Sequence, residues 1–368
     1  MAPFRVLLFT FLVLAGCTPR PNLILVPEAA DVGKVVDVYY ASTRTPDPEL
    51  GLGIERSSTP SFGRVSVAVP PAHKLGKVEV GKGRPDPAES FAVAEVANYP
   101  SPDVFRKSLS NTFRSRPRGS REAVIFIHGF NNNFTEGVFR TAQLEHDFDL
   151  DAVAIHYAWP SRGSPIGYAY DRDSALFARD GLEQLLRDVR GAGAESVLLI
   201  AHSMGAQLSM ESMRQMAIRS PAELRRSIDG VVLLSPDIDI DVFRSQSARI
   251  GQLPQPFVIF VSQRDRALAL SARLSGESNR LGNVGSVDQV ADIDVTIFDV
   301  TEFSKATDLG HFTVGSSPAL ISMLSSLPGI DAMFRGDTTG RTGLLQGTVL
   351  TVQEATKIVL SPITVLAE

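Results

Sequence analysis

The sequence is poor in the residues that build disulfide frameworks and metal sites. It has one cysteine, Cys17, so a disulfide within the chain is excluded. Its six histidines are dispersed along 368 residues, which argues against a metal-binding cluster. The net charge of −5 and the scattered arginines give no indication of a nucleic-acid partner. The composition therefore favours chemistry carried by side chains alone, with neither a metal nor an organic cofactor.

Long hydrophobic runs are also scarce, and the one at the N-terminus is short. Arg5 precedes an apolar run at residues 6–14, which is too short to span a membrane as a mature helix. The sequence Leu-Ala-Gly-Cys at residues 14–17 resembles a bacterial lipobox, which implies lipidation of Cys17; an ordinary secretory signal is the alternative. Acyl chains on Cys17 would hold the protein at a membrane. Thr18, and not an aspartate, follows Cys17. The resemblance therefore implies that the protein is located in the cell envelope, at the outer membrane facing the periplasm.

The rest of the chain alternates between buried strands and helical patterns. A hydrophobic content of 43% and a charged content of 21% are ordinary for a globular protein. Continuous apolar runs predict strands that are buried on both faces, and helical spacing separates them. This alternation predicts an α/β fold with a doubly wound, mostly parallel sheet. The predicted strands cover residues 124–127, 152–160, 197–200, 230–236, 256–262 and 295–300.

We expect four parts along the chain. Residues 1–16 are the signal peptide, and the proline-containing residues 17–34 form a tether. Residues 35–327 form the main domain, in which residues 35–120 add antiparallel strands and loops to one edge of the sheet. Residues 328–368 form a C-terminal extension that contains a β-like segment without an assigned role.

The segment Ala-His-Ser-Met-Gly at residues 201–205 lies between a predicted buried strand and a predicted helix. It differs by one residue from the pattern G-x-S-x-G, because Ala201 stands at the first glycine position. A serine on such a strained turn exposes its hydroxyl, and the following helix points its free N–H groups at developing negative charge. We therefore predict that Ser203 is a nucleophile.

An upstream strand at residues 124–127 ends in His128 and Gly129. A glycine there allows the backbone to turn, so that the Phe130 N–H can aim at a tetrahedral oxygen beside the Met204 N–H. A plain strand-to-loop turn is the alternative, with the His128 ring bonded to the loop. We predict that Phe130 and Met204 form the oxyanion hole.

The partners of Ser203 follow from the order Ser, acid, His that such a turn requires. His311 is the one histidine beyond Ser203, so it is the predicted general base. Two carboxylates follow neighbouring strands and compete for the role of the acid: Asp265 is favoured and Asp237 is the alternative. Either carboxylate could instead cap the next helix.

Trp159 is the only tryptophan and follows the strand at residues 152–160. Ligands bind at this end of open parallel sheets, so Trp159 is a candidate for lining an acyl pocket. Packing at the edge of the sheet is the favoured alternative.

Five segments in this order, His-Gly-Phe-Asn-Asn-Asn-Phe, Trp-Pro-Ser, Ala-His-Ser-Met-Gly, Ser-Pro-Asp-Ile-Asp and Asp-Arg-Ala-Leu, resemble a bacterial esterase/lipase-like family of α/β-hydrolases of unknown function. The resemblance covers residues 35–325. It implies an α/β-hydrolase fold and carries the family's nucleophile, acid and base to Ser203, Asp265 and His311. It says little about the substrate, because one fold hosts many chemistries.

The sequence therefore predicts a serine hydrolase that cleaves a small-molecule carboxylic ester through an acyl-enzyme, tethered to the membrane by Cys17. A thioesterase or amidase of the same fold would use the same residues. The alternative from another class is a non-catalytic lipoprotein that binds envelope components with a hydrolase fold. The oligomeric state stays open.

Overall fold

The computed structural model describes residues 20–47, 51–276, 280–304, 310–326 and 348–361. Cys17, the predicted signal peptide and the first part of the C-terminal extension lie outside these ranges, so their predictions are not addressed by the fold. No helix in the described part of the chain is both long and apolar enough to cross a membrane.

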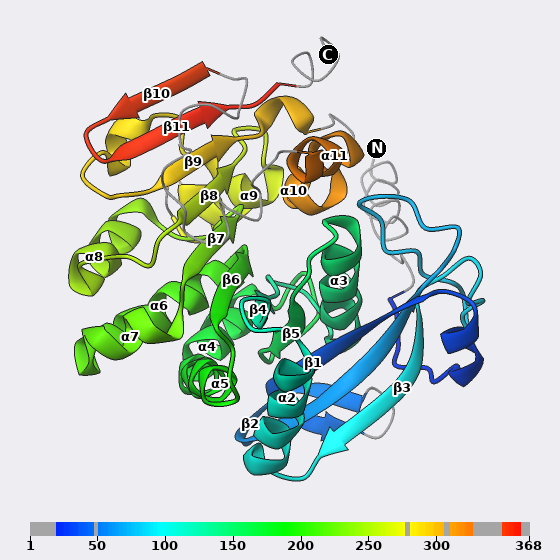
Figure 1. Cartoon of the computed structure of the whole chain (residues 1–368). Helices are drawn as coiled ribbons and strands as arrows, with labels where there is room; N and C mark the ends of the chain where they lie inside the picture. The colour runs from blue at the N-terminus through cyan, green and yellow to red at the C-terminus, as the bar shows by residue number, and fades with distance from the viewer. Residues whose placement is uncertain (1–19, 48–50, 277–279, 305–309, 327–347, 362–368) are drawn as a thin grey trace, which may run out of the picture.

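The described residues form one sheet of eleven strands (Figure 1). The strands are β1 Lys34–Asp47, β2 Gly51–Val69, β3 Ala92–Tyr99, β4 Glu122–Ile127, β5 Val153–Ala158, β6 Ser196–His202, β7 Gly230–Leu234, β8 Phe257–Val261, β9 Thr296–Asp299, β10 Thr348–Val352 and β11 Ala355–Val359. Their order is β10-β11-β9-β8-β7-β6-β4-β5-β1-β2-β3. All pairs from β11 to β1 are parallel, and the pairs β10–β11, β1–β2 and β2–β3 are antiparallel.

Helices connect these strands. They are α2 Pro102–Ser115, α3 Phe134–Asp147, α4 Tyr168–Phe177, α5 Arg179–Gly191, α6 Met204–Arg219, α7 Pro221–Ser227, α8 Ile240–Ile250, α9 Arg266–Leu274, α10 Thr313–Ser316 and α11 Pro318–Ser326. Short 3-10 helices are η1 Pro27–Asp31, η2 Leu281–Asn283, η3 Val287–Val290 and η4 Thr301–Phe303.

Alternate side chains of the central strands pack against helices on opposite faces of the sheet. In β6, Leu199 joins a core shared with α2, α5, α6 and α8, whereas Ile200 joins a core shared with α10 and α11. Helix α3 packs over β1, β2 and β5 (Figure 1). The prediction of a doubly wound, mostly parallel sheet with helices on both faces is confirmed, because both faces of each apolar strand are covered.

The N-terminal addition contains the strands β1, β2 and β3 with their connecting loops, and the 3-10 helix η1 precedes it. Strand β1 joins β5 in parallel, and β2 and β3 extend the edge in antiparallel order. Residues 20–34 differ from a free tether: Val26 and Ala29 are buried, and the Val26 N–H donates to the Val93 carbonyl at 2.8 Å. Apolar side chains in this segment pack on the sheet instead of remaining in solvent.

The described part of the C-terminal extension is a hairpin, β10 and β11, that continues the sheet beyond β9. Ala355, Ile358 and Leu360 are buried there, and Lys357 Nζ lies 3.0 Å from Asp299 Oδ2 of β9. The hairpin therefore covers the edge that β9 would otherwise expose. The boundaries of the four-part division remain a prediction.

Candidate active site

Ser203 occupies a strained turn between β6 and α6. Its φ of 54° and ψ of −120° are unusual for a residue with a Cβ atom. The Ser203 N–H donates to the Leu234 carbonyl at 3.0 Å, and the Asp237 N–H donates to the Ser203 carbonyl at 3.2 Å. These bonds to the neighbouring strand end hold the turn in the conformation that a nucleophile elbow requires.

Two glycines allow close packing around this turn. A Cβ atom on Gly205 would lie 2.7 Å from the Ile127 carbonyl oxygen and would also strike the His128 carbonyl oxygen. A Cβ atom on Gly129 would lie 2.9 Å from Ser203 Cβ. Both glycines are therefore required by the close approach of the β4 end to the elbow, whereas the buried methyl of Ala201 is accommodated in the core.

The structure brings Ser203, His311 and Asp265 together. His311 Nε2 lies 2.7 Å from Ser203 Oγ, and His311 Nδ1 lies 2.8 Å from Asp265 Oδ2. Ser203 and His311 are 108 residues apart in the sequence. The Asp265 side chain has no exposed surface, and one fifth of the His311 side chain is exposed. The imidazole can therefore accept the serine proton at one nitrogen while the carboxylate holds the other.

Asp265 and Asp237 have different partners. Besides facing His311, Asp265 caps α9, because its Oδ1 accepts the Leu268 N–H at 3.0 Å. Asp237 accepts hydroxyl hydrogen bonds from Tyr168 at 2.9 Å and Ser271 at 2.6 Å. Of the two carboxylates that the sequence left in competition, Asp265 is the one placed on the histidine.

Phe130 and Met204 have backbone N–H groups with no protein acceptor among the hydrogen bonds of the described residues. Met204 begins α6, where the first N–H groups have no partner within the helix. Phe130 lies in the turn that Gly129 packs against Ser203. Free donors on both sides of the serine fit the predicted oxyanion hole, and that role remains a prediction.

Arg44 contacts the turn that carries Phe130, a role that the sequence analysis did not predict. The residue is completely buried, and its guanidinium donates to the carbonyls of Asn132 at 2.9 Å, Ser161 at 3.0 Å and Gly53 at 2.9 Å. Burial lowers the pKa of Arg44 to about 10, so the group stays cationic at neutral pH. One buried cation thus joins three segments beside the site.

Asp171 stabilises the same turn from another side. Its Oδ2 accepts the Asn131 N–H at 3.2 Å and the Ser161 hydroxyl at 2.5 Å, and its Oδ1 accepts the Arg162 N–H at 2.7 Å. The pKa of Asp171 lies above its usual value, because the effect of burial, which raises it, is larger than that of these hydrogen bonds, which lower it. The turn that carries the Phe130 N–H is therefore preorganised by Arg44 and Asp171.

Trp159 has no exposed surface, which favours packing over an acyl pocket. Its ring stacks on the His128 ring at 4.8 Å, and its Nε1–H donates to the His128 carbonyl at 2.7 Å. The His128 ring in turn lies 2.9 Å from the Gly129 carbonyl and 3.0 Å from the Trp159 carbonyl. Burial and the Arg44 charge hold the pKa of His128 well below its usual range, so this ring is a neutral structural group.

His202, directly before the nucleophile, contacts the loop of His311. Its Nε2–H donates to the His311 carbonyl at 3.0 Å, and its ring lies 4.7 Å from the His311 and Phe312 rings. Burial and the charge of His311 hold the pKa of His202 well below its usual range. A neutral His202 therefore fixes the loop that carries the predicted base.

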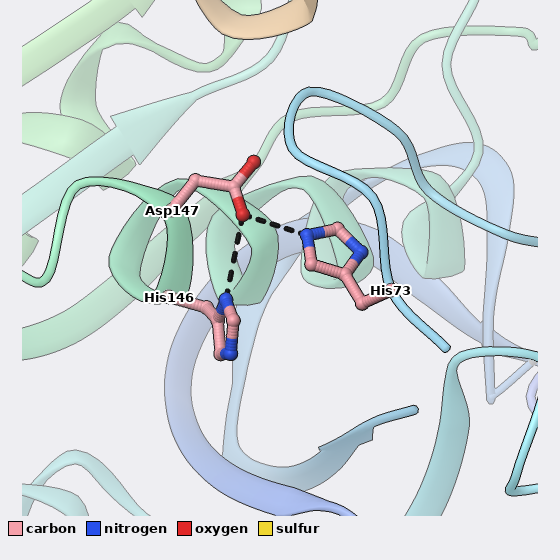
Figure 2. A group of neighbouring side chains, drawn as sticks. All are labelled: His73, His146 and Asp147. Carbon is pink, nitrogen blue, oxygen red and sulfur yellow. Dashed lines mark hydrogen bonds and ion pairs between the residues drawn. The ribbon is translucent and has the colours of Figure 1, made fainter. Parts of the chain in front are cut away.

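Dispersal along the sequence does not keep the histidines apart in the fold. Outside the Ser203 site, His73, His146 and Asp147 have potential ligand atoms within 4.8 Å of one another (Figure 2). The argument that dispersed histidines exclude a metal cluster is therefore wrong at this position.

The profile of a family described as "Alpha/beta hydrolase of unknown function (DUF900)" matches residues 101–327, which is more than half of the chain. The chain belongs to this α/β-hydrolase family. The match spans α2 to α11 and includes Ser203, Asp265 and His311. No match is found among curated proteins.

The hydrolase chain is also similar to solved structures of low sequence identity. Lipase B of Aspergillus fumigatus is 11% identical, with 60% of this chain and 55% of that chain covered and a TM-score of 0.37. An esterase of Rhizomucor miehei is 12% identical, with 91% and 98% covered and a TM-score of 0.35. The Pyrococcus furiosus esterase Pf2001 is 12% identical, with 77% and 88% covered and a TM-score of 0.32. The hydrolase chain thus spans about half the length of the lipase and most of the length of the two esterases.

Proposed function

We propose that this α/β-hydrolase is a serine carboxylesterase that acts through Ser203, His311 and Asp265. The observation that carries the proposal is the position of His311, 2.7 Å from Ser203 Oγ and 2.8 Å from Asp265 Oδ2. A histidine between a strained serine and a buried carboxylate is the arrangement that activates a hydroxyl for acyl transfer.

The first half of the reaction forms an acyl-enzyme. Ser203 Oγ attacks the ester carbonyl carbon while His311 Nε2 takes the hydroxyl proton. The carbonyl oxygen becomes an oxyanion, which the N–H groups of Phe130 and Met204 stabilise by roughly 3 kcal/mol per donor. The bond between carbon and the alcohol oxygen then breaks, and His311 returns the proton to the leaving alcohol. Asp265 accepts the Nδ1–H of His311 throughout and stabilises the imidazolium.

The second half repeats these steps with water. His311 removes a proton from the water, whose oxygen attacks the acyl carbon and forms a second oxyanion. Collapse of this intermediate breaks the bond to Ser203 Oγ and releases the carboxylic acid. The serine recovers its proton from His311, so the enzyme is regenerated and each turnover consumes one ester and one water.

The test is hydrolysis of p-nitrophenyl acetate, butyrate and octanoate by the full chain. Ser203→Ala is expected to lower kcat at least roughly 10³-fold, because the attacking oxygen is removed. Ser209→Ala is the matched control. Ser209 is buried like Ser203, but it lies within α6 and its hydroxyl donates to the Gly205 carbonyl of the same helix. The control is expected to retain wild-type turnover. A fluorophosphonate is expected to label the wild type and Ser209→Ala but not Ser203→Ala.

A folded wild type that is no faster than Ser203→Ala and resists the fluorophosphonate would overturn the proposal. The non-catalytic lipoprotein that binds envelope components would then take its place. Labelling together with faster cleavage of a matched acyl thioester or anilide would instead identify a thioesterase or amidase of the same fold.

We further propose that Cys17 is lipidated and tethers the hydrolase to the cell envelope. The residues 14–17 support this proposal. The Arg20 guanidinium donates to Asn131 Oδ1 at 2.6 Å beside the Phe130 turn. Three residues span at most about 10 Å, so an anchor at Cys17 would hold this turn close to the membrane surface. Mass spectrometry of the mature N-terminus is expected to find acyl chains on Cys17 and none in Cys17→Ser; an unmodified Cys17 in envelope fractions would contradict the anchor.

A further inference from the structure

His73, His146 and Asp147 form a compact cluster away from the Ser203 site. His73 lies in the loop between β2 and β3, and His146 and Asp147 are the last two residues of α3 (Figure 2). We propose that this cluster binds a divalent cation of the zinc class and fixes the β2–β3 loop to α3. The inference does not depend on the proposed esterase activity.

One carboxylate oxygen lies between the two imidazoles. Asp147 Oδ1 is 2.6 Å from His73 Nε2 and 3.4 Å from His146 Nδ1, although His73 and Asp147 are 74 residues apart in the sequence. Neighbouring ligand atoms in a tetrahedral site with bonds of about 2.1 Å are about 3.4 Å apart. The His146 pair already has this spacing, and the His73 pair must open by less than about 1 Å to admit the ion.

The outer contacts orient the ligand atoms as metal sites require. His73 Nδ1 lies 2.9 Å from Glu79 Oε2, so Nδ1–H donates to that carboxylate, while Nε2 faces Asp147 Oδ1 at 2.6 Å, where a bound ion would take the place of the Nε2 proton. This is the carboxylate–histidine arrangement that fixes the tautomer and raises the basicity of a ligating imidazole. The other oxygen of Asp147 accepts the Gly76 N–H at 2.7 Å and the Gln143 amide, so Oδ1 is the oxygen that faces the two imidazoles.

Burial and ligand chemistry select zinc over hard cations. The His73 side chain is 5% exposed and the Asp147 side chain has no exposed surface, whereas His146 is 28% exposed. Two imidazoles and one carboxylate suit Zn²⁺, whereas Mg²⁺ and Ca²⁺ prefer oxygen ligands. Three protein ligands leave a fourth position for water on the side of His146.

The position of the cluster indicates a structural role for the ion. The 14 residues of α3 separate Asp147 from the capped start of the helix at Asn133, a length of about 20 Å. The same loop contacts α10, because a Cβ atom on Gly76 would lie 2.6 Å from the Ser316 carbonyl oxygen. An ion at Asp147 would therefore hold together the β2–β3 loop, the end of α3 and the start of the segment that follows His311.

Calorimetric titration of the untagged, chelator-stripped full chain with Zn²⁺ tests this proposal. The wild type is expected to bind one ion per chain and to gain thermal stability as it binds. His146→Gln removes one partly exposed ligand and is expected to weaken binding more than tenfold, since losing an outer-shell partner alone costs 10- to 100-fold. Asp149→Asn is the matched control, because it removes a fully exposed charge three residues after His146 and asparagine tolerates the positive φ of 48°.

Glu79→Gln is a second variant that keeps all three ligands and is expected to weaken Zn²⁺ binding 10- to 100-fold. Ser203→Ala is expected to bind Zn²⁺ like the wild type, which separates this result from the outcome of the esterase assay. Absence of stoichiometric Zn²⁺ binding, or equal affinity in the wild type and His146→Gln, would overturn the proposal and leave a hydrogen-bond network that joins the loop to α3.

Discussion

Asp237 and Asp265 follow neighbouring strands, yet each serves a different side chain. Asp265 Oδ2 faces His311, and its other oxygen caps α9. Asp237 Oδ1 lies 3.3 Å from Arg280 Nε, both side chains are almost completely buried, and the Asp237 N–H supports the Ser203 carbonyl. The first carboxylate is therefore placed to orient the base, and the second to neutralise a buried cation beside the elbow.

Asparagine at these two positions separates the two roles. Asp265→Asn is expected to lower kcat by roughly 10³- to 10⁴-fold, because the amide cannot hold the His311 tautomer or stabilise the imidazolium. Asp237→Asn is expected to retain kcat within about tenfold but to lose about 3 kcal/mol of stability, because the buried Arg280 loses its counter-charge. Ester hydrolysis and urea unfolding of both variants measure this. A larger loss of kcat in Asp237→Asn than in Asp265→Asn would assign the role of the catalytic acid to Asp237.

At the residue scale, the nucleophile and the base could be predicted from the sequence, because both follow from the order of residues along the chain. A serine in the elbow pattern and one downstream histidine leave little choice for Ser203 and His311. Arg44 could not be predicted, because its acceptors are the carbonyls of Gly53, Asn132 and Ser161, which meet only in the fold. Every residue has a backbone carbonyl, so residue types do not show which carbonyls a buried arginine will bind. The role of such an arginine can be recognised only in the structure.

Helix α6 begins directly against the end of β4, and Gly205 makes this contact possible. Gly205→Ala is expected to cost about 1–3 kcal/mol or more, because its Cβ would meet the backbone oxygens of Ile127 and His128. The shift of α6 would also move Ser203 relative to the Phe130 N–H and lower kcat.

Gly191→Ala is the matched control, because a Cβ atom there would meet nothing within 4 Å at the end of α5. Its stability is expected to stay unchanged or to rise by up to about 1 kcal/mol. Urea unfolding and kcat of both variants measure the difference. Equal effects at Gly205 and Gly191 would show that the close approach of α6 and β4 does not matter.

The hairpin β10–β11 is joined to β9 by a buried ion pair as well as by backbone hydrogen bonds. Lys357 Nζ lies 3.0 Å from Asp299 Oδ2 and donates to the Gly285 carbonyl at 2.9 Å. Lys357→Met is expected to cost about 3 kcal/mol, because the Asp299 carboxylate would stay buried without its cation.

Adding Asp299→Asn to Lys357→Met is expected to restore part of this loss by removing the unpaired charge. Lys82→Met is the control, because it makes the same substitution on an exposed loop residue. Unfolding free energies from urea titrations compare the variants. A Lys357→Met protein as stable as Lys82→Met would show that the hairpin contributes no buried pair to the sheet.

At the element scale, the central strands could be predicted because a strand buried on both faces is a continuous apolar run. Strand β3 could not, because its sequence Ala-Val-Ala-Glu-Val-Ala-Asn-Tyr is rich in alanine, which has low strand propensity. Helices α4 and α5 are separated at Ala178, where the Tyr157 hydroxyl donates to the Ala178 carbonyl at 2.6 Å. Such contacts between distant segments decide where elements begin and end.

For the whole molecule, the alternation of strands and helices predicts the fold class but not which distant side chains meet. The expected doubly wound sheet follows from short connections between apolar strands. The approach of His73 to Asp147 depends instead on how the β2–β3 loop lies across α3, which no periodicity encodes. The spacing of histidines along the chain is therefore a poor guide to which of them meet in the folded protein.

Three histidines in the molecule have lowered pKa values: His128 and His156 are buried, and His202 is partly buried. Burial lowers the pKa of His156 to about 3, and burial together with a neighbouring positive charge holds those of His128 and His202 well below their usual range. A base with a lowered pKa binds protons more weakly in the folded protein than in the unfolded chain. As the pH falls below the unfolded value of about 6.5, protonation therefore favours unfolding.

His156 is expected to contribute about 1.4 kcal/mol per pH unit to the loss of stability between about pH 5.5 and pH 4, where it is protonated in the unfolded chain and neutral in the folded protein; His128 and His202 are expected to add to the loss in the same direction. His156→Asn keeps a donor for the Phe126 carbonyl, to which His156 Nδ1–H donates at 3.1 Å, but cannot titrate. This variant is expected to show a slope lower by about 1.4 kcal/mol per pH unit. Urea unfolding at a series of pH values measures both slopes, and equal slopes would mean that His156 is protonated as readily in the folded protein as in the unfolded chain.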